Sequence, residues 1–152
     1  MSKLGLKIFV IFILVALGGL ILTSIFINYR FDYYFENYLR NIRKNKVGEK
    51  VIPVRGDARE VIDEYLVGKS DRVLMPLPEF ARDFIESAFK TVKPEGGIIH
   101  FYDYGEEPEV FGPSFEFIKN LDIDRSVELK DKAIVRSYAP NLYHVVLDLL
   151  VK

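Results

Sequence analysis

The segment from Asp71 to Tyr104 constrains the fold of this chain more than any other stretch. It reads DRVLMPLPEFARDFIESAFKTVKPEGGIIHFYDY, and its apolar run Val73 to Met75 predicts a short strand. The turn Pro76-Leu77-Pro78 follows, then a helix from Glu79 to Val92, a Gly-Gly turn and a second strand from Ile98 to Tyr102. A strand, a helix and a strand with so little chain between them predict a parallel α/β unit. Such units bind ligands beyond the carboxyl ends of their strands, so we expect the functional site there.

Upstream of this unit the sequence predicts two helices and one strand. Phe31 to Asn45 carries apolar residues at spacings of three and four with basic residues opposite them, which is typical of an amphipathic helix. Val51 to Val54 is a short apolar run before Gly56-Asp57 and predicts a buried strand with a ligand-side loop. Ala58 to Leu66 predicts a short helix. We expect the strand at Val51 to Val54 to join the parallel sheet.

Downstream of the unit the sequence predicts a closing hairpin. Ser114 can cap a helix that reaches about Leu121. Lys132 to Ser137 and Tyr143 to Val151 then predict two strands, which would form an antiparallel hairpin from Ala133 to Val151. The fold class predicted from these elements is α/β.

The composition favours one folded domain and excludes thiol chemistry. The chain has 152 residues, of which 49% are hydrophobic and 14% aromatic, enough to fill one core. It contains no cysteine and only two histidines, so disulfides and thiolate metal sites are excluded and no metal centre is expected. His100 and His144 each lie in a strand-like run, and we interpret both as structural residues without an assigned role.

The N-terminal stretch is uncharged over the length of a membrane-spanning helix. Residues Ile8 to Ile27 read IFVIFILVALGGLILTSIFI, close to the about 20 residues that a bilayer requires. We therefore expect a transmembrane helix within residues 1–30 and a separate domain over residues 31–152. A cleaved signal peptide is the alternative, but the run is longer than the usual apolar region of such a peptide. More bases follow the run than precede it at Lys3 and Lys7, which predicts a single-pass protein with a cytoplasmic C-terminal domain.

Several stretches of the chain together resemble one known family. The stretches are Glu36 to Val47, Val51 to Glu60, Asp71 to Pro78, Lys93 to Tyr102 and Val135 to Asp148. They are similar to the archaeal and eukaryotic tRNA guanine-N1 methyltransferases, which modify the base 3′ of the anticodon, and to their wybutosine-pathway relatives. The resemblance extends over residues 31–152 or nearly so.

The resemblance implies a class I methyltransferase fold that binds S-adenosylmethionine. It also implies that this chain carries only the second half of that fold, a partial Rossmann-like sheet. In such domains a Gly-rich turn after the first strand holds the cofactor, and the sequence has no such turn after a strand. Where the family carries an acid for the ribose hydroxyls, the chain has Tyr29-Arg30-Phe31-Asp32. We therefore expect S-adenosylmethionine binding to be weak or lost, and the chain to be inactive alone.

The adenine end of the cofactor is the part for which the resemblance implies a site. It implies that the Asp57 carboxylate accepts a hydrogen bond from the exocyclic amine of adenine, while the amide of Ala58 addresses a ring nitrogen. The alternative is an aspartate that only forms the turn after Gly56.

A second candidate site is the loop after the first strand of the α/β unit. Pro76, Leu77 and Pro78 stand where relatives commonly carry Asn-Leu-Pro against the methyl donor and the target base. A proline offers only its carbonyl there, and a rigid strand-to-helix turn is the alternative interpretation. Arg136 is a further candidate for substrate binding, whereas we interpret the neighbouring Tyr138 as a packing residue. No general base is assigned, because in the family it belongs to sequence upstream of this region.

The resemblance implies tRNA as a partner, and a second polypeptide that supplies the missing half is another possible partner. The candidate tRNA contacts are Arg40, Arg43, Lys44 and Lys46, since phosphate neutralisation by Lys and Arg dominates RNA affinity. The alternative for these bases is a solvated helix face beside a membrane. Two other functions stay open: a noncatalytic membrane-anchored interaction protein, and a sensor-like membrane protein, since Leu4 to Leu39 is similar in composition to the opening of bacterial sensor kinases.

Overall fold

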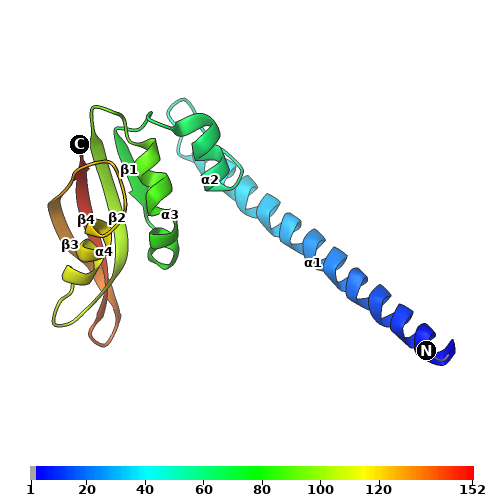
Figure 1. The fold of residues 1–152 in the computed structure, drawn as a ribbon. Helices are drawn as coiled ribbons and strands as arrows, with labels where there is room; N and C mark the ends of the chain where they lie inside the picture. Colours follow the sequence, from blue (N-terminus) through cyan, green and yellow to red (C-terminus); the bar gives the residue numbers. More distant parts are fainter. Residues whose placement is uncertain (1–2) are drawn as a thin grey trace. The chain divides into compact units, whose positions relative to one another are not determined.

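The computed structural model of the protein describes the backbone of residues 3–152 and the side chains from Leu17 onward, Asn28 and Phe31 excepted (Figure 1). The chain forms two compact units, Met1–Arg55 and Gly56–Lys152. The predicted boundary between residues 30 and 31 falls inside a helix of the first unit. The functional division of the chain therefore stays a prediction.

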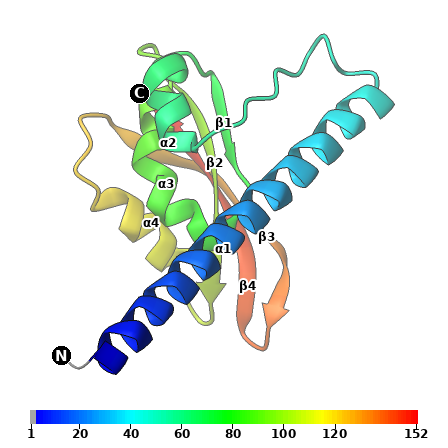
Figure 2. The same cartoon turned by 90° about the vertical axis from the view of Figure 1, so that its right-hand side faces the viewer.

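The first unit is built on one long helix, α1, which runs from Lys3–Lys44 without a break (Figures 1 and 2). The sequence predicted two helices here, one from Ile8 to Ile27 and one from Phe31 to Asn45. They are continuous because no proline or glycine separates them. The helix ends where Lys46 adopts a left-handed conformation with φ of 56°, and the bases in its last turn complement the helix dipole.

The predicted membrane span and the cytoplasmic placement of the C-terminal domain are corrected by the structure. Among the residues that the structure describes, none of the helices has the length and apolar character needed to cross a membrane. The same helix, α1, continues past this apolar run through Arg30 and Asp32. The side chains of residues 8–16, and those of Lys3 and Lys7, lie outside the described residues.

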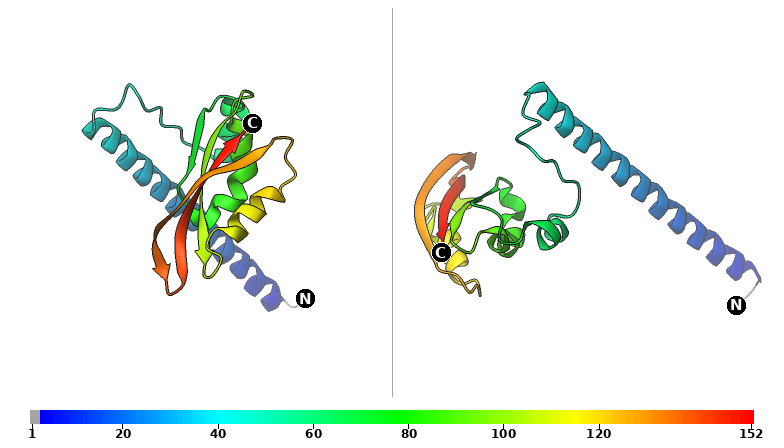
Figure 3. Two further views of the ribbon diagram at one scale, coloured as in Figure 1. Left: turned by 90° about the vertical axis from the view of Figure 1, so that its left-hand side faces the viewer. Right: turned by 90° about the horizontal axis from the view of Figure 1, so that it is seen from above.

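The second unit contains a mixed four-stranded sheet. Its strands are β1 (Arg72–Met75), β2 (Gly97–Glu106), β3 (Val127–Ala139) and β4 (Leu142–Val151), in the spatial order β1-β2-β4-β3 (Figures 1 and 3). β1 and β2 are parallel, whereas β4 is antiparallel to both β2 and β3. The α/β fold class, the parallel pair and the closing antiparallel hairpin are therefore confirmed.

The strand predicted at Val51 to Val54 is wrong. These residues are irregular, and the Ile52 side chain is 88% exposed. An isolated strand leaves its backbone groups without ladder partners, and none of the four strands in the described sheet pairs with this segment. The apolar pattern of the segment is that of a buried strand. Such a strand needs a neighbouring strand, and the described sheet provides none for this segment.

Helices cover one face of the sheet. α3 (Pro78–Thr91) and α4 (Gly112–Lys119) pack on β2, and their side chains Ile85, Phe89 and Ile118 form one core with alternating residues of β2 and β4. The fully buried strand residues on this face are Ile99, Phe101, Val145, Leu147, Leu149 and Val151. This alternation follows from the period of two in a strand, which sends successive side chains to opposite faces.

Two smaller features of the second unit concern its helices. α2 (Ala58–Val61) continues into one π-helical turn, η1 (Ile62–Leu66), which confirms the helix predicted for this stretch. The predicted cap at Ser114 is wrong, because α4 begins at Gly112 with Pro113 in its first turn, and Ser114 is buried inside the helix. Proline suits a first helical turn, where its missing amide hydrogen would have no intrahelical partner.

The opposite face of the sheet carries a row of partly exposed side chains. Ile98, His100 and Tyr102 of β2 lie on it, opposite Leu150, Asp148 and Val146 of β4. His100 Nδ1 lies 2.6 Å from the Asp148 carboxylate. α3 and α4 both contribute to the core on the other side, so neither covers this face.

Candidate functional site

The carboxyl ends of β1 and β2 lie at the same edge of the sheet, at its lower end in Figure 1, because the two strands are parallel. β1 ends at Met75, and Pro76 and Leu77 connect it to α3. Leu77 is the N-cap residue, with φ of −109° and an exposed side chain, and Pro78 occupies the first turn. The predicted rigid strand-to-helix turn is thus present at the edge where ligands of parallel strands bind.

A short hydrogen bond joins this turn to the end of β2. The hydroxyl of Tyr104 donates to the carboxylate of Glu79, the residue after Pro78, at 2.6 Å. The bond stabilises the neutral phenol, so it raises the pKa of Tyr104 to about 12. The same bond lowers the pKa of Glu79, with smaller contributions from His144 and Arg136. Glu79 is therefore a carboxylate and Tyr104 a neutral donor at neutral pH.

Replacing Glu79 with glutamine should lower the pKa of Tyr104 from about 12 towards the ordinary value of 10.0. A charged acceptor holds the phenol proton more strongly than an amide oxygen does. The measurement is a tyrosinate absorbance titration, with the Tyr104→Phe spectrum subtracted to isolate this residue. A pKa that is the same in the wild type and in Glu79→Gln would contradict the hydrogen bond.

The Glu79–Tyr104 bond also sets a pH window for stability. The pKa of Tyr104 is raised, so its contribution is fully present below pH 10 and is lost as the pH rises to about 12. The pKa of Glu79 is lowered, so its contribution is present above pH 4.5 and is lost as the pH falls below that value. The bond is therefore at full strength throughout the neutral range.

An aromatic cluster continues from Tyr104 across the hairpin. Tyr104 pairs directly with His144 in the β2–β4 ladder, and their ring centroids lie 4.9 Å apart at 74°. The Tyr138 ring stacks on His144 at 5.0 Å and 18°, and it meets Tyr104 edge-on at 5.1 Å. We call Tyr104, Tyr138 and His144 the aromatic cluster. It places three rings from three strands at the candidate edge.

Arg136 completes this arrangement. Its Nε donates a hydrogen bond to His144 Nδ1 at 3.1 Å, and because a guanidinium has no acceptor capacity, Nδ1 is the acceptor of this bond. His144 is 7% exposed, and its buried Nε2 has no hydrogen-bond partner within the described chain. Arg136, predicted from the sequence as a substrate contact, is thus held against the aromatic cluster.

Asp57 and Ala58, predicted at the adenine end of the cofactor, lie at the start of α2. Asp57 is the N-cap residue, and its Oδ1 accepts a hydrogen bond from the Arg59 amide at 2.8 Å. The carboxylate is exposed, and its other oxygen has no protein partner in the part of the chain that is described. Arg59 also stacks on Phe84 at 4.3 Å, which fixes α2 against α3. Asp57 therefore has the structural role of capping the turn into α2. Its contact with the cofactor stays a prediction.

The bases predicted to contact tRNA belong to the first unit. Arg40, Arg43 and Lys44 lie in the last turns of α1, Lys46 follows it, and all four side chains are exposed. Arg43 Nε donates to the Leu39 carbonyl at 3.4 Å. Arg55 pairs with Asp32 within the same unit. Contact of these bases with RNA stays a prediction.

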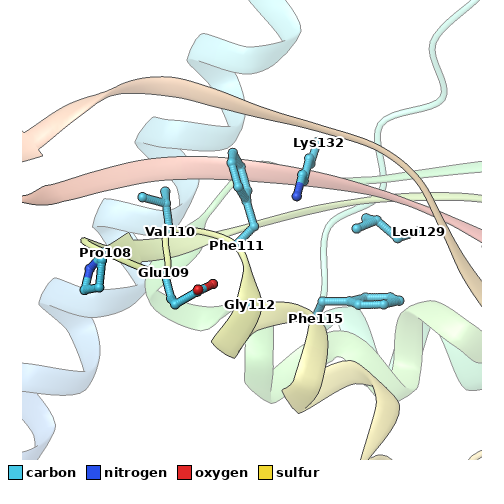
Figure 4. Close-up of a pocket in the computed structure, with 8 residues that line it drawn as sticks. All are labelled: Pro108, Glu109, Val110, Phe111, Gly112, Phe115, Leu129 and Lys132. Atoms are coloured by element: carbon cyan, nitrogen blue, oxygen red, sulfur yellow. The ribbon is translucent and has the colours of Figure 1, made fainter.

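A shallow cavity of about 320 Å³ lies on the helix-covered side of the sheet (Figure 4). Its lining comes from the loop after β2, the start of α4 and β3, and consists of Pro108, Glu109, Val110, Phe111, Gly112, Phe115, Leu129 and Lys132. Lys132 Nζ lies 4.9 Å from the centre of the Phe111 ring. None of the residues predicted for the site lines this cavity. Over the described residues, no three His, Asp or Glu side chains gather closely enough to hold a metal ion.

Sequence reasoning found the Pro76 turn and Arg136 but missed Tyr138, His144, Tyr104 and Glu79. The missed residues come together only through the hairpin register, which pairs His144 with both Tyr104 and Arg136. The alternation of β4 did indicate that His144 lies on the face opposite the core residue Val145. The alternation thus indicates on which face of the sheet His144 lies, but it does not indicate which residues His144 contacts.

Comparison with known proteins gives the family. The TRM5/TYW2 methyltransferase domain matches residues 23–130. The tRNA (guanine(37)-N(1))-methyltransferase Trm5b of Pyrococcus abyssi is 37% identical over 113 residues, which are 73% of this chain and 32% of that protein. The crystal structure of Pyrococcus abyssi Trm5b is similar with a TM-score of 0.67 at 35% identity, covering 78% of this chain and 34% of that chain.

Two further solved structures contain ligands of this kind of protein. The complex of aTrm5 and tRNALeu is 39% identical with a TM-score of 0.63, over 78% of this chain and 32% of that chain. The Methanocaldococcus jannaschii TYW2 complex with AdoMet is 27% identical with a TM-score of 0.63, over 78% and 52%. The chain spans about a third of the length of the Trm5b relatives that it matches. By its match over most of its length, the chain belongs to the TRM5/TYW2 methyltransferase domain family.

Proposed function

We propose that this chain is the C-terminal part of an S-adenosylmethionine-dependent tRNA guanine-N1 methyltransferase. The observation that supports this most is the edge described above. There Glu79, next to the Pro76-Leu77-Pro78 turn, bonds Tyr104, and Tyr104 contacts the His144 ring that Arg136 bonds. That edge is where parallel sheets bind ligands. The relatives of this chain include a tRNA guanine-N1 methyltransferase and a protein solved with AdoMet.

The residues present fit the adenine end of the cofactor. Asp57 offers a free carboxylate oxygen, and Ala58 is the first residue of a helix, whose amide has no intrahelical acceptor. A Gly-rich turn after a strand, which would hold the methionine end, is not found in the described residues. When bound, S-adenosylmethionine supplies an electrophilic methyl group. The role of this chain in the proposed reaction is to position the target base. Positioning is the main requirement for a direct displacement.

We propose that a second polypeptide with the Gly-rich half completes the fold. β1 is a four-residue edge strand whose outer side pairs with no other strand in the described chain, and its Leu74 side chain is exposed. Short parallel strands belong inside a sheet, and an open apolar edge is a template for pairing with another chain. The partly exposed row at Ile98, His100 and Tyr102 would then be covered by the same polypeptide.

The test is methyl transfer to a tRNA transcript by the whole chain, alone and co-expressed with the part of Pyrococcus abyssi Trm5b that this chain does not match. We expect N1-methylguanine only when both polypeptides are present. Co-purification of the two without any methylation would overturn the proposal. Micromolar binding of S-adenosylmethionine by the chain alone would overturn the assignment of the methionine end to a partner.

Within the same complex, Asp57→Asn should weaken S-adenosylmethionine binding by about tenfold. The amide cannot accept the charge-assisted hydrogen bond from adenine, and such bonds contribute about 1.5–3 kcal/mol. Calorimetry on the complex measures this, and Asp63→Asn is the matched control, because Asp63 pairs with Lys90 on the surface. Equal affinity of the wild type and Asp57→Asn would remove Asp57 from the site.

A further inference from the structure

We propose that the outer face of the Tyr138 ring is a stacking platform for a purine base of RNA. The platform rests on the proposed function, since it assigns the surface by which the same edge would receive its RNA substrate. Tyr138 was interpreted from the sequence as a packing residue. Its surroundings point to a ring that is held in place and also open to a ligand.

The first observation is that Tyr138 combines order with exposure. One face of its ring lies on His144 at 5.0 Å with an interplanar angle of 18°, yet the residue is 57% exposed. Tyr65 is similarly exposed at 54% but stacks on no described ring. A ring fixed before binding loses little conformational freedom when a base stacks on it. Aromatic side chains of this kind are what single-stranded RNA bases stack on.

The second observation is that the support beneath the platform is fixed from two sides. Arg136 Nε bonds His144 Nδ1, which sets the orientation of the imidazole under Tyr138. Tyr104 meets both rings edge-on and is itself bonded to Glu79 at 2.6 Å. The platform is therefore continuous with the Pro76-Leu77-Pro78 turn, where the methyl acceptor is proposed to lie.

The third observation is charge. The Arg136 side chain is exposed, and only its Nε has a hydrogen-bond partner among the described residues. Its two terminal nitrogens are free to form the paired hydrogen bonds that a guanidinium makes to phosphate. Arg136 and Tyr138 both contact the His144 ring, so a nucleotide stacked on Tyr138 would have this guanidinium nearby for its phosphate. A flat ring next to a free guanidinium fits a nucleotide better than it fits an aliphatic helix.

The experiment uses the full chain and a short single-stranded RNA with 2-aminopurine at its centre, whose fluorescence is quenched on stacking. We expect quenching by the wild type and by Tyr138→Phe, which keeps the ring. Tyr138→Ser and Tyr138→Leu should each lose about tenfold in affinity, which is the size expected for one base stacked on one ring. Tyr65→Ser is the matched control and should behave as the wild type.

A second RNA with an abasic site at the same position separates stacking from backbone binding. Wild type and Tyr138→Ser should bind this RNA with the same affinity, because no base is present to stack. Absence of quenching by the wild type, or equal affinity of the wild type and both ring-deleting variants for the 2-aminopurine RNA, would overturn the platform. Thermal unfolding of each variant shows whether the chain is folded, and Tyr138→Leu keeps an apolar side chain in case the serine variant is not.

Methyl transfer by the co-expressed complex distinguishes this inference from the proposed function. If the complex methylates tRNA and Tyr138→Ser leaves kcat/KM unchanged, the platform is wrong and the function stands. If the base is quenched on Tyr138 but the complex never methylates, the methyltransferase assignment is wrong and the platform stands. We expect methylation with kcat/KM lowered about tenfold in Tyr138→Ser, since one base of the RNA substrate then loses its stacking partner.

Discussion

Replacing Arg82 with alanine should lower the free energy of unfolding by about 3–5 kcal/mol, the usual cost of leaving a buried charge without its partner. Asp103 of β2 is 3% exposed and lies beneath α3. Among the described residues, the hydrogen bonds to its carboxylate all come from Arg82, with Nη2 at 2.7 Å and Nε at 3.1 and 3.3 Å from the carboxylate oxygens. Arg82 also lies over the Phe117 ring at 4.8 Å, so it connects α3 and α4 to the sheet.

Urea unfolding of the purified chain measures this effect through the midpoint and slope of the transition. The matched control is Lys152→Ala, which breaks the exposed pair between Lys152 and Glu128 and should change stability by less than about 1 kcal/mol. The double variant Arg82→Ala with Asp103→Asn should recover part of the loss, because it removes the buried charge. An Arg82→Ala protein within about 1 kcal/mol of the wild type would contradict the role given to this pair.

Replacing Gly105 with alanine should cost about 3 kcal/mol or more, which is at the upper end for overpacked sites. A Cβ at this position would lie 2.0 Å from the carbonyl oxygen of Val110 and 2.9 Å from its carbonyl carbon. These are backbone atoms, so relief requires movement of the loop that follows β2. Because Gly105 is next to Tyr104, that movement should also weaken the Tyr104 bond to Glu79.

Gly112→Ala provides the matched control for this prediction. A Cβ there would meet only the flexible Glu109 side chain, at 3.2 Å from its Oε2 and 3.9 Å from its Cβ. Gly112 is the first residue of α4, and alanine is favoured over glycine in helices by roughly 0.5–1 kcal/mol. We therefore expect Gly112→Ala to be neutral or slightly stabilising in the same urea experiment, whereas equal effects of the two substitutions would contradict the steric argument.

The sequence determined the elements whose signals are local. Pro78 begins α3, as a residue without an amide hydrogen is expected to do, and Val73 to Met75 and Ile98 to Tyr102 lie in parallel strands as predicted. The resemblance to tRNA guanine-N1 methyltransferases also came from short residue runs and is confirmed by the family match over residues 23–130. These features depend on neighbours along the chain, so pattern and composition were sufficient to predict them.

The strand predicted at Val51 to Val54 failed for a non-local reason. Its apolar pattern is that of a buried strand, but a strand exists only where another strand satisfies its hydrogen bonds, and the sheet of the second unit provides no such neighbour. The membrane span is corrected because no helix of the described residues has the length and apolar character needed to cross a membrane. At Val51 to Val54 the local pattern was read correctly, and its surroundings decided the outcome.

Only the tertiary structure decided which side chains form the candidate site. Arg136 was predicted from a residue run, whereas Tyr104, Tyr138 and His144 meet because of the register in which β4 pairs with β2 and β3. That register is shifted by irregularities along β3, so it could not be counted from the hairpin turn. Glu79 likewise reaches Tyr104 only because α3 folds back onto β2. A sequence specifies faces through its period of two, but opposite partners depend on how strands align, and that alignment is set by packing across the whole sheet.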